Sequence, residues 1–432
     1  MLAYYLDLAL RSFKRNIALT ILMIVAIGFG VGASMTTLTV LHVLSADPIP
    51  QKSHQLHYVQ LDPQPLQGFI PGREPNNQST RFDAETLLRE HRADKQAIMT
   101  GGSAAIEPQR PGLDPFRVDG RWTSNEFFSM FDVPFVKGRG WSAQDDTAHA
   151  RVVVISKVLA EKVFGNSDVI GFSLHVAGTE MRVVGVIDDW RPTPHFYDLN
   201  TDVYGQGEAL FVPWTTSLDL KLRQNGDMSC WGEHDDPTDL NAPCEWTQFW
   251  VQLDSDEKLD AYNAFLINYS KEQYRSGRFG RPPNVRLRDV MQWLDYKKVV
   301  PSDAKLQMWV ALGFLLVCLI NTVGLLLTKY LRRSAEIGVR RALGASRRAI
   351  FVQLLVEAGM IGFVGGLFGL LLAALGLWAV RHQPTSYAEL AQLDLPMLAA
   401  TFALAVITSI LAGILPAWRG CQVTPALQLK SL

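Results

Sequence analysis

Residues Ile17–Leu44 read IALTILMIVAIGFGVGASMTTLTVLHVL and contain no Asp, Glu, Lys or Arg. An α-helix needs about 20 apolar residues to cross the hydrocarbon core of a bilayer, so this run is long enough to span a membrane. Three further runs are uncharged apart from Glu357: Leu306–Thr328, Ala349–Val380 and Leu395–Trp418. Buried core helices of soluble proteins, the alternative, rarely stay apolar over such a length. The sequence therefore predicts four membrane-spanning helices.

The composition limits the remaining classes of protein. Hydrophobic residues make up 48% of the 432 positions, charged residues only 19%, and the formal net charge is −1. A near-neutral chain does not bind nucleic acid by bulk charge, since such binding needs a basic excess that displaces phosphate counterions. Four cysteines form neither a disulfide scaffold nor a standard zinc frame. No nucleic-acid partner is expected.

Basic residues gather on one side of the predicted spans. The segments before the first span, between the second and third, and after the fourth carry 12 basic and two acidic residues. The segment Asp47–Lys305 carries 28 basic and 37 acidic residues. Because loops rich in Lys and Arg stay in the cytoplasm, we expect both termini inside and the large segment outside.

The chain before the first span predicts an amphipathic helix on the membrane surface. Apolar residues recur at helical spacing over residues 1–16, with the charged residues on the other face. A frayed basic terminus is the alternative. The following apolar run is too long for the core of a signal peptide, so no cleavage is expected.

The large outer segment has the pattern of a mixed α/β domain. Arg151–Ile155 predicts a strand and Ser156–Phe164 a helix, and Leu174–Val176 with Met181–Ile187 predicts a hairpin. Phe211–Trp214 is a further strand candidate. Two stretches rich in turn residues predict irregular loops, Asp62–Gln78 and Trp231–Pro243.

Cys230 and Cys244 both lie in this outer segment. In an oxidising compartment they could form a disulfide. A metal site of Cys230, His234, Asp235 and Cys244 is the alternative, although its spacing fits no standard zinc frame and no metal is expected. No catalytic motif and no G-x-x-x-x-G-K-[ST] phosphate loop occurs. We therefore expect no cofactor and no enzyme activity in this chain, with a membrane enzyme as the minor alternative because the outer domain is large.

The link Leu331–Arg348 reads LRRSAEIGVRRALGASRR. Its order predicts a short helix with Ile337 and Leu343 on an apolar side and Gly344 as its end, suited to a groove on a cytoplasmic partner. The residues concerned are Glu336, Ile337, Gly338, Arg340, Arg341, Ala342, Leu343 and Gly344.

The third span is rich in glycine and contains one carboxylate. Gly362, Gly365, Gly366 and Gly369 match small-xxx-small spacing, which lets helices approach closely in lipid. Glu357 is a candidate for anchoring to Arg347, Arg348 or lipid headgroups, or for coupling to an ion.

Several ordered motifs resemble those of MacB/FtsX-type permeases of ABC transporters. The following are similar to the FtsX-like transmembrane module: Glu336–Ala345, Gln353–Ala358, Gly365-Gly366, Leu415–Arg419 and Thr424–Leu427. The following are similar to the MacB-like periplasmic core: Asn125–Phe128, Val133-Pro134, Gly138–Gly140, Asp145-Asp146, Val152–Ser156, Phe164-Gly165, Asp168–Gly171 and Val183–Val186. The segment 197–248 matches neither.

This resemblance implies an architecture and a set of partners. Such permeases have four spans in the bacterial inner membrane, with a large periplasmic or extracellular domain between the first two. They pair as homodimers or heterodimers, contact membrane lipids, and bind cytoplasmic ABC ATPase subunits that supply ATP and magnesium. The basic link is then the ATPase-coupling helix. The family's macrolide exporter carries a fused ATPase, which the present sequence lacks, so involvement of a periplasmic adaptor and an outer-membrane channel is left open.

The resemblance implies export of an amphiphilic or peptide-like substrate by mechanotransmission. The alternatives are a signalling transmitter, for example of a cell-wall hydrolase, and a lipoprotein-extraction permease. The predicted segments are a surface helix (1–16), the first span and stalk (17–46), the outer domain with a porter-like part and an inserted subdomain (47–300), the second span (301–328), the coupling link (329–348), the third span (349–380), a short outer loop (381–394), the fourth span (395–418) and a cytoplasmic tail (419–432).

Overall fold

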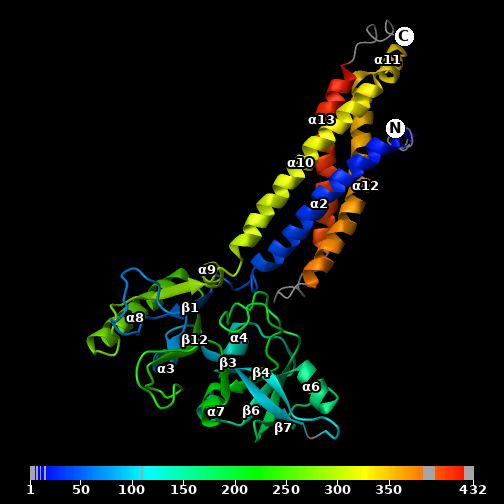
Figure 1. The fold of residues 1–432 in the computed structure, drawn as a ribbon. Coiled ribbons are helices and arrows are strands. Elements are labelled where there is room, and N and C mark those ends of the chain that lie inside the picture. Colours follow the sequence, from blue (N-terminus) through cyan, green and yellow to red (C-terminus); the bar gives the residue numbers. More distant parts are fainter. Residues whose placement is uncertain are drawn as a thin grey trace. The chain divides into compact units, whose positions relative to one another are not determined.

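The computed structural model describes residues 5, 8–9, 11–13, 16–108, 110–382 and 395–422. The chain forms two compact units, one of Met1–Ser45 with Val300–Leu432 and one of Ala46–Val299. Figure 1 shows the first as a helical bundle and the second as a sheet with helices. A mixed α/β domain is thus inserted between the first two long helices, which confirms the predicted fold class.

The bundle contains four helices that are long and apolar enough to cross a membrane. They are α2 (Ile17–Ser45), α10 (Ser302–Arg332), α12 (Arg347–Arg381) and α13 (Leu395–Cys421), and the short α11 (Ser334–Ala342) joins α10 to α12. α2 packs against α10 and α12, and α13 packs against α12 and α10. α10 and α12 extend past the apolar runs into the basic link. The long side chains of Lys and Arg at these helix ends can reach the membrane surface.

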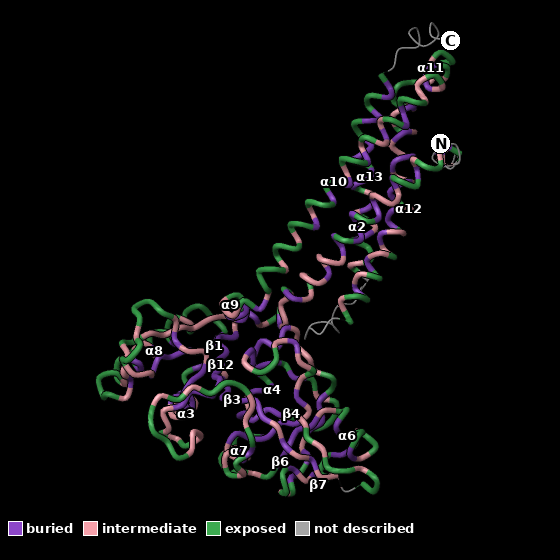
Figure 2. The backbone as a smooth tube through the Cα atoms, viewed as in Figure 1, coloured by how far each residue is buried: buried purple, intermediate pink, exposed green. Residues whose placement is uncertain are grey.

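Exposed positions recur along the helices of the bundle, as Figure 2 shows, and many of them carry apolar side chains. The exposed large side chains include Ile21, Leu22, Leu316, Leu371 and Ile407. A soluble protein does not expose apolar surface of this extent, so these positions fit contact with lipid. The inner sides carry small and buried residues, which lets the helices approach one another.

The second unit is built on one large sheet. Its strands are β1 (Leu56–Gln60), β2 (Ser79–Thr80), β3 (Lys95–Glu107), β4 (Phe116–Thr123), β5 (Phe135–Gly138), β6 (Val152–Ser156), β7 (Ser173–Val176), β8 (Thr179–Ile187), β9 (Leu210–Pro213), β10 (Arg223–Asn225), β11 (Ser229–Cys230), β12 (Cys244–Gln252) and β13 (Arg286–Asp289). Its helices are α3 (Arg81–Glu90), α4 (Phe127–Met130), α5 (Ala143–Thr147), α6 (Lys157–Phe164), α7 (Trp214–Asp219), α8 (Asp256–Arg275) and α9 (Val290–Tyr296).

The strand order along the sheet is β13-β1-β12-β3-β4-β9-β6-β8-β5. β6 pairs parallel to β8 through α6, and β4 pairs parallel to β9, while the other pairs along this path are antiparallel. β7 and β8 form the predicted hairpin, whose turn residues Ala177 and Gly178 have φ of 48° and 78°. Positive φ at both central residues suits the right-handed twist of the strands. The predicted strand, helix and hairpin between Arg151 and Ile187 are therefore confirmed.

The core of this unit lies around β12, whose nine residues are all buried. Apolar side chains of α3, α6 and α8 pack against the same core cluster. The two predicted loops, Asp62–Gln78 and Trp231–Pro243, contain neither helix nor strand.

Parts of three predicted segments fall on residues that the structure does not describe. In the predicted surface helix, Tyr5, Leu8, Ala9 and Arg11–Phe13 are helical, and most other positions lie outside the described residues. Residues 383–394 of the outer loop and 423–432 of the tail also lie outside them.

Candidate functional site

The basic link folds as the short helix α11, followed after a turn by α12. Glu336 lies in the first turn of α11, and Arg340 and Arg341 lie in its last turn. This distribution complements the helix dipole, which favours acidic groups at the N-terminus and basic groups at the C-terminus. Gly344 has φ of 98° just beyond the end, in the left-handed conformation that glycine adopts readily. Ser346 then caps α12 by accepting a hydrogen bond from the Ala349 amide.

α11 has one buried side and one exposed side. Ile337 and Gly338 are buried against the bundle, whereas Val339 is 51% and Leu343 83% exposed. The prediction that Ile337 and Leu343 share an apolar side is wrong, because six residues at 100° each place them about 120° apart. The apolar side chains of Val339 and Leu343 therefore face away from the bundle, on either side of Arg340 and Arg341 in the sequence.

A buried ion cluster lies behind α11, around Glu357 of α12. Lys329 Nζ of α10 lies 2.7 Å from Glu357 Oε1, and Arg333 Nη1 lies 3.0 Å from Oε2. The Ser12 hydroxyl also donates to Oε1. Lys329 and Glu357 are 0% and 1% exposed. Burial of such charges is tolerated only when they are paired, so each group here depends on the others.

The cluster continues onto α11. Arg333 also pairs with Glu336 at 3.3 Å, and Glu336 pairs with Arg340 at 2.8 Å. Arg340 Nη1 in turn donates to Gln353 Oε1 of α12 at 3.2 Å. This chain of contacts connects α11 through side chains to both neighbouring helices.

The partners of Glu357 differ from those that the sequence suggested. Its carboxylate contacts Lys329 and Arg333, not Arg347 or Arg348, and it is buried instead of reaching lipid headgroups. Sequence reasoning missed Ser12, Lys329 and Arg333 as members of one cluster. The signal for the two cations was their spacing of four residues, which places Lys329 in the last turn of α10 and Arg333 at its C-cap on the same side.

The four predicted packing glycines of α12 lie at helix contacts. A Cβ at Gly362 would lie 2.4 Å from Ser409 Cβ of α13, and one at Gly366 would lie 2.9 Å from Ala405. A Cβ at Gly365 would lie 3.0 Å from Ile27 Cγ2 of α2, and one at Gly369 would lie 3.1 Å from the Gly28 carbonyl. Alternate glycines thus bring α12 close to two different helices.

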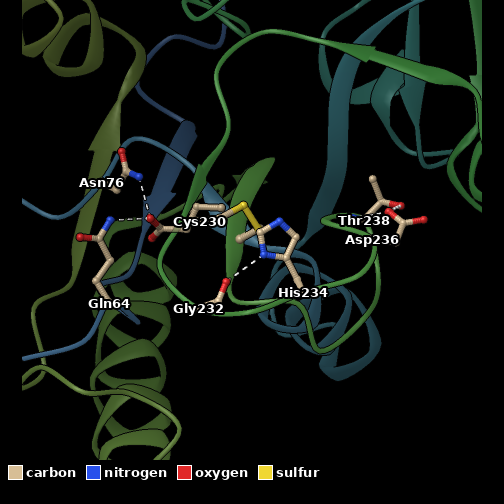
Figure 3. Close-up of a disulfide and its surroundings, with 9 residues drawn as sticks. Gln64, Asn76, Cys230, Gly232, His234, Asp236 and Thr238 are labelled. Atoms are coloured by element: carbon tan, nitrogen blue, oxygen red, sulfur yellow. Dashed lines mark hydrogen bonds between the residues drawn. A yellow bond between two sulfur atoms is a disulfide. The ribbon is translucent and has the colours of Figure 1, made fainter.

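In the outer unit, Cys230 and Cys244 form a disulfide between β11 and β12 (Figure 3). His234 lies beside it, and its Nδ1 is 2.9 Å from the Gly232 carbonyl. Asp235 does not belong to this group of candidate ligands. Bonded sulfurs offer no thiolates to a metal, so the structure holds the disulfide and not the metal alternative.

The bundle and the inserted sheet domain together define a multi-pass membrane protein with a mixed α/β domain between its first two spans. Comparison with known proteins agrees. The MacB-like periplasmic core domain family matches residues 20–268, and the FtsX-like permease C-terminal family matches residues 308–425. The chain belongs to the MacB/FtsX-type family of ABC transporter permeases.

Curated relatives include a macrolide export ATP-binding/permease protein MacB of Marinobacter nauticus. It is 26% identical over 98% of this chain and 60% of its own length. A pyoverdine export ATP-binding/permease protein PvdT of Pseudomonas savastanoi pv. phaseolicola is 27% identical over 84% of this chain and 51% of the relative. The present chain thus spans about 60% or less of these relatives.

Among solved structures, the periplasmic region of MacB from Actinobacillus actinomycetemcomitans is similar to 59% of this chain and 96% of that chain. Its sequence identity is 14% and its TM-score 0.36. The extracellular domain of the ABC-type transporter YknZ from Gram-positive bacteria covers 54% of this chain, at 14% identity and a TM-score of 0.34.

Proposed function

We propose that this chain is the permease subunit of an ABC exporter that a separate cytoplasmic ATPase drives. The observation that carries the proposal is α11, which exposes Val339 and, just past its end, Leu343, while Arg340 bonds to Glu336 and to Gln353 of α12 and so fixes the other side of the helix to the bundle. A helix that is rigidly attached and exposes an apolar stripe suits insertion into a groove on a partner. ATP and magnesium would bind to that partner.

The proposed path of force starts at α11. The ion pairs among Arg333, Glu336 and Arg340 resist movement of α11 relative to α10 and α12. α2 and α10 connect covalently to the outer domain at Ser45 and Val300. A displacement of α11 would thereby be transmitted along α2 and α10 to the outer domain. This proposal needs no substrate channel through the bundle.

The family and the names of the relatives support the rest of the proposal. Two relatives are named for the export of a macrolide and of pyoverdine, so we propose export of an amphiphilic or peptide-like substrate from the outer leaflet or the periplasm. Function requires a second permease subunit, identical or different.

The test is purification of the tagged chain from its native membranes in mild detergent. Leu343→Asp places a charge on the exposed side of α11 without breaking the ion pairs, and Leu66→Asp is the control because Leu66 is 62% exposed in the outer unit. We expect wild type and Leu66→Asp to co-purify an ABC ATPase with ATP hydrolysis, and Leu343→Asp to lose both. Arg340→Glu with Arg341→Glu should also lose them. Equal ATPase recovery with every variant would refute the proposal.

A further inference from the structure

Cys230, His234 and Cys244 of the outer unit form a cluster of three side chains whose atom types bind metal ions. Cys230 and Cys244 lie directly opposite each other on β11 and β12, so both sulfurs are on one face of the strand pair. The loop between the two cysteines returns His234 to the sulfurs, as Figure 3 shows. The ligand atoms of the three residues lie within 4.8 Å of one another. The sulfurs form a disulfide here, so the cluster has a second chemistry once that bond is reduced.

The imidazole of His234 is oriented as a ligand. Its Nδ1 lies 2.9 Å from the Gly232 carbonyl, an oxygen that can only accept a hydrogen bond. Nδ1 therefore carries the hydrogen, and Nε2 keeps the lone pair that a metal ion needs. Histidines that bind metals commonly donate their other ring N–H to a carbonyl or a carboxylate in this way. His234 is also exposed, so an ion can reach it from solvent.

Backbone contacts hold the cluster together without the disulfide. The Trp231 amide donates to the Pro243 carbonyl at 3.1 Å, just beyond the two cysteines. The loop that carries His234 is also bound to α3, because Arg81 Nη1 donates to the Thr238 carbonyl at 2.9 Å. Ligand atoms around a tetrahedral zinc ion lie roughly 3–4 Å apart, given metal–ligand bonds of about 2.0–2.3 Å. Small rotations of the side chains therefore suffice to complete a site after reduction.

The disulfide is accessible from one side. Cys230 is exposed, whereas Cys244 is fully buried. Exposed disulfides are the ones that thiol–disulfide exchange reaches most readily. The thiolate of a dithiol protein would attack the Cys230 sulfur and release the Cys244 sulfur as a thiolate. The second thiol of the same protein would then displace Cys230. In total, two electrons and two protons pass to the cysteines, and the dithiol protein leaves as its own disulfide.

We infer that the reduced chain binds a thiophilic cation, Zn²⁺ or Cu⁺, through Cys230, His234 and Cys244. Thiolate sulfur and imidazole nitrogen are ligands that these ions prefer. Binding displaces the two thiol protons into solvent. Exchange with an oxidised protein disulfide would remove both thiolates and release the ion, so the site is under redox control. The inference goes beyond the proposed function and requires neither ATP nor an ATPase.

The test uses the full chain in detergent with Cys318→Ser and Cys421→Ser, so that only this pair supplies thiols. The chain is reduced with a phosphine, which is then removed without oxygen, and Zn²⁺ or Cu⁺ is titrated in competition with a coloured chelator. We expect the reduced chain to bind one equivalent of at least one ion, and the oxidised chain to bind it at least tenfold more weakly. Co²⁺, as a probe of the ligands, should give a thiolate-to-metal charge-transfer absorption that Cys244→Ser removes.

A pair of histidine variants checks the third ligand. His234→Ala should weaken binding to the reduced chain at least tenfold. His54→Ala removes another exposed histidine of the outer unit and should leave binding unchanged. Equal unfolding temperatures of the oxidised variants would show that both fold.

Thiol trapping in cells tests whether the reduced state occurs. Acid quenching followed by alkylation should reveal chains with both thiols free, and their fraction should rise when a dithiol oxidoreductase is overproduced. A chain that stays fully oxidised under both conditions would overturn the inference. So would absence of binding after reduction, equal binding by the oxidised chain, or an unchanged affinity in His234→Ala. None of these results bears on recovery of the ATPase with α11, so the two proposals fail separately.

Discussion

The buried carboxylate of Glu357 pairs with Lys329 and Arg333 and accepts a hydrogen bond from the Ser12 hydroxyl, all from outside its own helix. Replacing it with alanine would leave Lys329 fully buried without a counter-charge. We expect Glu357→Ala to destabilise the bundle by about 3–5 kcal/mol, as removal of one partner from a buried pair does. The measurement is the denaturation midpoint of the full chain in detergent.

The exposed Glu272 of α8 supplies the control, since Glu272→Ala removes the same charge without stranding a buried cation. The double variant Lys329→Met with Glu357→Leu should recover part of the loss, because both buried charges leave together. A loss no larger than that of Glu272→Ala would show that the buried pair contributes nothing.

Glu245 lies beside the disulfide and has an unusual environment for a carboxyl group. Burial raises its pKa to about 8, and the charges of Asp62 and Asp83 act in the same direction. Hydrogen bonds from Asn76 and Gln64 to Oε2 oppose the shift, while Oε1 has no hydrogen-bond partner among the described residues. The folded protein therefore holds this proton at neutral pH, whereas the unfolded chain releases it near pH 4.5.

This proton makes the stability of the outer unit depend on pH. Between pH 4.5 and about 8 the folded state binds more protons than the unfolded state, so the free energy of unfolding falls as pH rises. The slope from this group approaches about 1.4 kcal/mol per pH unit. Glu245→Gln should remove this pH dependence, because glutamine does not titrate. The difference in free energy of unfolding between Glu245→Gln and wild type should therefore be more favourable to the variant at pH 8 than at pH 5. Thermal unfolding at several pH values measures this dependence, and Glu257→Gln, at an exposed position, is the control. Parallel pH profiles for wild type and both variants would contradict the raised pKa of Glu245.

Glycines of α12 lie where this helix packs against α2 and α13. A Cβ at Gly362 would lie 2.4 Å from Ser409 Cβ and 2.9 Å from the Ala405 carbonyl, so α13 would have to move. We expect Gly362→Ala to destabilise the bundle by about 1–3 kcal/mol through overpacking. The denaturation midpoint in detergent reports the change.

Gly359, one turn earlier on α12, is the matched control. Among the described residues outside the adjacent backbone of its own helix, the nearest atom to a Cβ there would be Ile410 Cγ1, at 3.8 Å. Gly359→Ala should be neutral or stabilise by up to about 1 kcal/mol, since alanine favours helix. The same loss in both variants would mean that helix packing does not explain these glycines.

Sequence patterns predicted those elements that depend on neighbours along the chain. Uncharged runs located the four spans, and residue order located α11 and the hairpin of β7 and β8. Contacts between distant residues were not predictable in this way. Glu357 meets Ser12, and Arg121 meets Asp198, only because the fold brings together segments 345 and 77 residues apart.

The placement of the whole chain in the membrane depends on the charge balance of its segments. Native thiols do not test it, because Cys318 and Cys421 are buried and Cys230 is bonded to Cys244. Introduced cysteines do: Leu343→Cys on the exposed side of α11, and Ser276→Cys at the exposed end of α8. Both are made with Cys318→Ser and Cys421→Ser, so that only the new thiol reacts.

In cells whose outer membrane admits the reagent, a maleimide that cannot cross the inner membrane should label Ser276→Cys and not Leu343→Cys. Lysis should make Leu343→Cys reactive, which controls for its accessibility. Labelling of Leu343→Cys before lysis would reverse the predicted orientation and remove α11 from reach of any cytoplasmic ATPase.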